Sequence, residues 1–129
     1  DFLKDESIQS ITVSAIGGKD RLEMGGKVEI EATVFAYADD EGTEDTADFY
    51  WAKNAKKPSW KYIDSVKAEE GGIQKLTVQH RIPDGEDFQA VRVNYRYKGS
   101  RSECSGGKYD DVDDLGFAVA EEETSAVIA

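Results

Sequence analysis

Apolar and polar residues alternate along most of this chain with the two-residue period of β-strands. The clearest case follows Gly25-Gly26, where two rows of side chains alternate: Val28, Ile30, Ala32, Val34 and Ala36 against Glu29, Glu31, Thr33, Phe35 and Tyr37. A period of two over ten residues places one row in a core and the other row outside it. The stretch predicts a long half-buried strand.

The same pattern recurs towards the C-terminus. Residues 73–82 and 88–97 alternate in the same way, and four further segments are rich in β-branched or aromatic residues: 7–16, 47–53, 60–66 and 115–119. Turn residues separate them, as in Gly17-Gly18 and Pro83-Asp84-Gly85. No segment sustains a period of 3.6. Seven strands at roughly ten-residue spacing predict an all-β fold, an antiparallel β-sandwich of Ig-like or jelly-roll-like type.

Two positions within these strands need comment. Ile11, Val13 and Ala15 share one face of the first strand, whereas Ile8 falls on the opposite face, so that strand alternates imperfectly. His80 shares the apolar face of its strand with Leu76 and Val78. We therefore expect His80 to be a histidine at the edge of the core rather than a ligand.

The 129 residues are enough for one domain with its own core. We place the sandwich at residues 1–120 and a tail, acidic and then apolar, at 121–129. The formal charge of −11 disfavours nucleic acid and anionic membranes as partners. No apolar run approaches the ~20 residues of a membrane span, so we predict no membrane insertion.

The sequence lacks the usual signatures of an enzyme. It contains no Gly-x-Ser-x-Gly motif and no phosphate-binding loop, and its one histidine, His80, is the only candidate base for a catalytic triad. Cys104 is the one cysteine, so a zinc site or a Cys/His pair would require these two residues to converge. We predict no catalytic activity.

An acidic cluster follows Gly106-Gly107, with four aspartates in five positions: Asp110, Asp111, Asp113 and Asp114. Carboxylates at such spacing repel one another unless they bind a cation or remain fully solvated. A short loop of oxygen ligands suits Ca²⁺ better than a transition metal. The alternative is a solvated acidic turn. Residues 38–48 form a second acidic stretch, interpreted as a loop, for which solvation is the simpler explanation.

Several motifs, in order, resemble a β-sandwich module found at the C-terminus of secreted peptidases, mainly serine peptidases. The resemblance covers roughly Asp5 to Val119. It rests on Asp5-Glu6-Ser7-Ile8, residues 26–34, Asp48-Phe49-Tyr50-Trp51-Ala52, Pro58-Ser59-Trp60, Gln89-Ala90-Val91-Arg92, residues 96–100, Cys104 and residues 110–115.

The resemblance implies a secreted, non-catalytic accessory or targeting module. Its partner is then an upstream catalytic domain or, if the module acts alone, neighbouring copies of itself. The resemblance also implies that two acidic motifs converge at one edge of the sandwich as a Ca²⁺ site, with six ligands: Asp5, Glu6, Asp110, Asp111, Asp113 and Asp114.

One departure from the family concerns Cys104. Family members commonly carry a cysteine just before the Asp-Glu-Ser motif that pairs with the cysteine at this position, and Asp1-Phe2-Leu3-Lys4 lacks it. Cys104 is then a free thiol or forms an intermolecular disulfide.

Two other functions are compatible with the sequence. A carbohydrate-binding or cell-surface-binding module would stack sugars on exposed aromatics, for which Trp51 and Trp60 are the candidates, although aromatics in sandwich strands usually pack the core. A self-assembling subunit of an extracellular filament or surface layer would use Cys104 and the two end segments, 1–6 and 124–129, of which an apolar one adds to a neighbour's sheet edge.

Overall fold

The computed structural model describes residues 7–36, 38–39, 42–43, 45–97 and 111–122. Within these ranges the chain forms seven long strands, a hairpin of two short strands and no helix. The long strands are β1 (Ser7–Ala15), β2 (Lys27–Ala36), β5 (Asp45–Ala52), β6 (Lys61–Lys67), β7 (Gly72–Arg81), β8 (Phe88–Tyr97) and β9 (Asp111–Ala118), and the hairpin pairs β3 (Ala38–Asp39) with β4 (Gly42–Thr43). The predicted all-β fold is confirmed.

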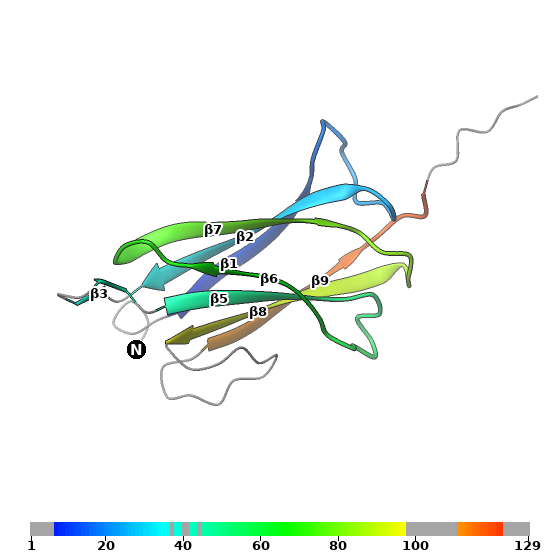
Figure 1. The fold of residues 1–129 in the computed structure, drawn as a ribbon. Helices are drawn as coiled ribbons and strands as arrows, with labels where there is room; N and C mark the ends of the chain where they lie inside the picture. The colour runs from blue at the N-terminus through cyan, green and yellow to red at the C-terminus, as the bar shows by residue number, and fades with distance from the viewer. Residues whose placement is uncertain (1–6, 37, 40–41, 44, 98–110, 123–129) are drawn as a thin grey trace, which may run out of the picture.

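The long strands form two antiparallel sheets. One has the order β1-β2-β7 and the other the order β6-β5-β8-β9. Figure 1 shows the two sheets as layers packed face to face, and β1 lies near β9 and β6 near β7 at the two sides. The molecule is therefore a β-sandwich with four edge strands. No helix in the described ranges is long and apolar enough to cross a membrane.

The core lies between the sheets and consists of the apolar rows that alternation predicts. Ile30 and Val34 of β2 face Phe49 of β5 and Val93 of β8, and all four are fully buried. Each large apolar side chain buried in this way contributes roughly 1.5–3 kcal/mol. The two-residue period therefore identifies the inward face of these strands correctly.

A bulge explains the imperfect alternation of β1. The pairing with β2 shifts between Ile8 and Ser10, which leaves Gln9 as an extra residue. Because one extra residue moves all that precedes it to the other face, Ile8 joins Ile11 on the inward side. Ile8 is 8% exposed and belongs to the core cluster.

Two stretches interpreted as acidic loops belong in part to strands. Asp45 and Asp48 lie in β5, where both are fully buried, so the predicted loop 38–48 ends earlier than expected. Asp111, Asp113 and Asp114 lie in β9, which begins at Asp111 rather than at Leu115. These corrections matter because a strand sends successive side chains to opposite faces.

Candidate functional site

Asp111 connects the two sheets at the edge where β1 and β9 begin. Its half-buried carboxylate accepts a hydrogen bond from the main-chain N–H of Ile8, with 2.9 Å between Ile8 N and Asp111 Oδ2. This contact spans 103 residues of sequence and brings the starts of β1 and β9 together. Three of the predicted ligands (Asp5, Glu6 and Asp110) lie outside the described residues, immediately before these starts in sequence.

Asp113 and Asp114 lie on opposite faces of β9. The exposed Asp113 pairs in register with the buried Val93, and its Oδ1 accepts the N–H of Asp114 at 3.0 Å. Asp114 lies on the outer face, where Arg92 holds both of its oxygens: Nε is 2.7 Å from Oδ1 and Nη2 is 2.8 Å from Oδ2. The strand thus separates Asp114 from Asp111 and Asp113. Among the described residues, no three histidine, cysteine, aspartate or glutamate side chains are grouped to hold a metal ion.

The two tryptophans have different surroundings. Trp51 is 2% exposed, donates its indole N–H to Gln89 at 2.7 Å and packs against His80 and Phe117 in the core. Trp60 is half-buried, and the Arg92 guanidinium carbon lies 4.5 Å from its ring centroid. Because Trp51 is buried, a sugar cannot reach its ring. Trp51 and Trp60 therefore do not form the exposed stacking surface that a sugar would need.

His80 lies at the edge of the core, as its position in the alternation predicts. Its half-buried ring tilts against Trp51, with 5.0 Å between ring centroids. Burial lowers the pKa of His80 below its ordinary value of 6.5, and the positive charge of Lys61 adds to the effect. Burial therefore favours the neutral form of the imidazole, which acts as a packing group.

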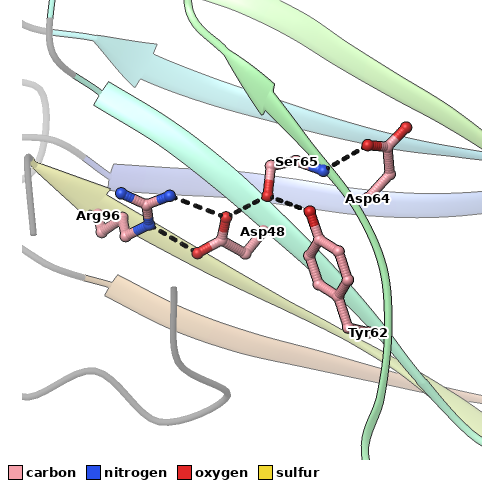
Figure 2. Close-up of polar contacts among 5 residues, drawn as sticks. All are labelled: Asp48, Tyr62, Asp64, Ser65 and Arg96. Atoms are coloured by element: carbon pink, nitrogen blue, oxygen red, sulfur yellow. Dashed lines mark hydrogen bonds and ion pairs between the residues drawn. The ribbon is translucent and has the colours of Figure 1, made fainter. Parts of the chain in front are cut away.

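A polar network on the outer face of the four-stranded sheet was not predicted. Figure 2 shows that it runs across three strands, from Arg96 of β8 through Asp48 of β5 to Ser65 and Tyr62 of β6. The fully buried Asp48 carboxylate accepts Arg96 Nε at 2.7 Å and the Ser65 hydroxyl at 2.6 Å. The Ser65 hydroxyl also lies 2.7 Å from the Tyr62 hydroxyl. The buried Asp48 carboxylate thus joins the three strands through Arg96 and Ser65, which favours a structural role.

The sequence contains one signal that could have revealed this network. Asp48 alternates with Ala47 and Phe49, which makes it a strand residue of the outer row rather than a loop residue. Arg92 and Arg96 form the polar row of another strand. Sequence alone does not show that these two strands are neighbours.

Glu23 anchors the other end of β9. Residues 22–24 pair with Ala120 in a parallel bridge, in which Ala120 N donates to Leu22 O at 2.8 Å and Met24 N donates to Ala120 O at 2.9 Å. The carboxylate of Glu23 accepts hydrogen bonds from Lys19 at 2.6 Å and Arg21 at 3.4 Å. The Lys19 hydrogen bond, supported by Arg21 and opposed by burial, holds the pKa of Glu23 below its ordinary value of 4.5.

A scan against protein-family models and a search of curated proteins found no match for this chain. The resemblance to peptidase-associated modules therefore rests on the sequence motifs alone. Cys104, the predicted source of an intermolecular disulfide, lies outside the described residues.

Proposed function

We propose that this chain is a non-catalytic β-sandwich module of a secreted protein and that Ca²⁺ binding where β1 and β9 begin stabilises it. The hydrogen bond between Ile8 N and Asp111 Oδ2 is the observation that carries the proposal. It supports the expected meeting of the Asp-Glu-Ser motif with the aspartates that precede the last strand.

We propose fewer Ca²⁺ ligands than the six that the sequence predicts, because Asp114 is left out. Both oxygens of Asp114 are engaged by Arg92, so this carboxylate is not needed for the site. Asp111 keeps Oδ1 available beyond its bond to Ile8, and Asp113 is exposed on the same face. Asp5, Glu6 and Asp110 complete the proposed set. Hard oxygen ligands of this kind, in irregular geometry, suit Ca²⁺ better than Mg²⁺.

The accessory role has separate support. Two buried polar pairs of the described residues, Asp48 with Arg96 and Trp51 with Gln89, hold strands together. His80 packs against Trp51, and among the described residues it has no acidic hydrogen-bond partner that would make it a catalytic base. The association with a secreted peptidase rests on the resemblance of the sequence.

A thermal melt after chelator treatment, with and without millimolar Ca²⁺, tests the proposal. A ligand that binds only the native state at one hundred times its Kd stabilises it by about 2.7 kcal/mol, which raises the melting temperature by several degrees in a domain of this size. Mg²⁺ should raise it less, because it gives up its waters reluctantly.

Asp111→Asn combined with Asp113→Asn should abolish the Ca²⁺ shift while the metal-free protein still folds. The matched control is Asp64→Asn, which changes an exposed aspartate of β6 that caps an N–H in the same way as Asp113. The proposal is wrong if Ca²⁺ leaves the melting temperature of the unmodified protein unchanged. Equal loss of the shift in the control would show only a general charge effect.

A further inference from the structure

The four edge strands of the sandwich are not equally protected. An edge strand presents main-chain N–H and C=O groups that can pair with a strand of another chain. In β1, β6 and β9 an aspartate accepts one of these outward N–H groups: Ile8 donates to Asp111, Ser65 to Asp64 at 2.8 Å, and Asp114 to Asp113. A carboxylate in this position blocks an incoming strand by occupying the N–H and by its charge.

Loop segments protect two of these edges further. The pairing of residues 22–24 with Ala120 covers the end of β9. Residues 13–15 of β1 line one shallow hollow together with residues 19–22. Residues 19–24 therefore lie beside the end of β1 and beside the residues that follow β9.

Within the described residues no aspartate accepts an outward N–H of the β7 edge, although Val66, Lys67, Glu69 and Glu70 line a hollow beside residues 74–77. Ile82 N donates to Gly26 O at 2.9 Å, so the even-numbered residues of β7 bond to β2, and the N–H groups of Lys75, Thr77 and Gln79 point away from the sheet. Within the described ranges these three N–H groups have no hydrogen-bond partner. At ten residues, β7 is as long as any strand that the structure describes, and Ile73 near its start is 61% exposed.

We propose that β7 is an interaction surface for a second copy of this chain, paired antiparallel with the same strand of the partner across a two-fold axis. The two three-stranded sheets would then form one continuous six-stranded sheet. A two-fold contact closes on itself, because each copy uses the same strand.

The sequence of β7 fits one register of this pairing. With Thr77 opposite its own counterpart, each outward N–H meets an outward C=O, because odd-numbered residues oppose odd-numbered residues. Lys75 then lies opposite Gln79, and Ile73 lies opposite Arg81. No two like charges face each other across the axis, and β7 contains no acidic residue. On a chain with a net charge of −11, a strand with no acidic residue of its own is a favourable place for two copies to meet, although Glu69 and Glu70 line a hollow beside its first half.

Cross-linking by cysteine tests the register. In a Cys104→Ser background, which removes the one native cysteine, Thr77→Cys places two thiols opposite each other at a Cα separation of about 5.5 Å, within disulfide range. Gln79→Cys is the matched control, since the two copies of residue 79 would lie about 13 Å apart along the strands. We expect Thr77→Cys to form a covalent dimer under mild oxidation and Gln79→Cys alone to form little. An equimolar mixture of Lys75→Cys and Gln79→Cys chains should cross-link between the two variants.

Sedimentation or light scattering tests the assembly itself. The molar mass should rise from 14.2 kDa to twice that value with concentration, and about 0.5 M salt should strengthen the association by screening the like net charges.

Thr77→Pro removes one outward N–H without breaking a bond to β2 and should give a monomer, while Thr77→Val should still dimerise. A chain that stays at 14.2 kDa at millimolar concentration in salt would overturn the proposal, as would equal cross-linking of Thr77→Cys and Gln79→Cys. Neither outcome depends on Ca²⁺, so failure here leaves the proposed metal site untouched.

Discussion

Two arginine–aspartate pairs on the outer face of the four-stranded sheet have the same chemistry and different surroundings. Arg96 binds Asp48 between the central strands β8 and β5, and Arg92 binds Asp114 between β8 and the edge strand β9. The Nε–Oδ distance is 2.7 Å in both. However, the side chain of Asp48 is 0% exposed and that of Asp114 is 44% exposed.

The difference shows that burial, rather than the distance between the charged atoms, determines how much stability is lost when one partner of the pair is removed. An exposed ion pair gains little because water solvates its separated charges almost as well. In a buried pair, removal of one partner leaves the other charge desolvated and uncompensated. Loss of the Arg92–Asp114 pair should therefore reduce the free energy of unfolding only slightly. The Arg96–Asp48 pair holds β5 against β8, and its loss should reduce that free energy more.

The largest expected effect comes from Arg96→Met. This change leaves the buried Asp48 carboxylate with the Ser65 hydroxyl but without a cation, and should reduce the free energy of unfolding by about 3–5 kcal/mol. Urea titration measures the loss. Addition of Asp48→Asn to the same chain should recover part of it, because a neutral amide costs less to bury. A loss below about 1 kcal/mol in the single variant would show that the two pairs are equivalent after all.

A smaller effect is expected from Asp114→Asn. The variant keeps Arg92 on the ring of Trp60 and removes only the charge of its partner, so the free energy of unfolding should fall by less than about 1 kcal/mol. About 0.5 M salt should reduce the difference between the two proteins further, because salt screens exposed charges. The contrast between the edge pair and the central pair would be wrong if Asp114→Asn reduced the free energy of unfolding as much as Arg96→Met does and if salt did not change that loss.

The smallest effect concerns a third carboxylate, Glu23, whose side chain is 9% exposed while those of its partners Lys19 and Arg21 are more than half exposed. Its pKa is lowered in the folded protein, so its contribution to stability is present above the unfolded value of 4.5 and is lost as the pH falls through the folded value. Glu23→Gln should therefore be less stable than the unmodified protein at pH 6. The gap should close as urea titrations move to pH values well below 4.5. A gap that is the same at every pH would mean that packing, and not charge, accounts for it.

The sequence by itself determined where the seven long strands lie and, in the strands that alternate cleanly, which face is buried. The alternation in residues 27–36 and 73–82 identified the core rows, including the position of His80 at the core edge. This succeeds because the period of a strand is a local property, set by the backbone and by the solubility of each side chain.

Only the tertiary structure decided which polar residues meet. The bulge at Gln9 moved Ile8 into the core, and the strand structure of residues 111–118 sent Asp114 to Arg92 and Asp113 to the other face. Asp48 appeared in the sequence as one more acid in an acidic stretch, and its partner Arg96 is 48 residues away. Alternation fixes the face of a residue but carries no information about strand order and register, which together determine which charges become neighbours.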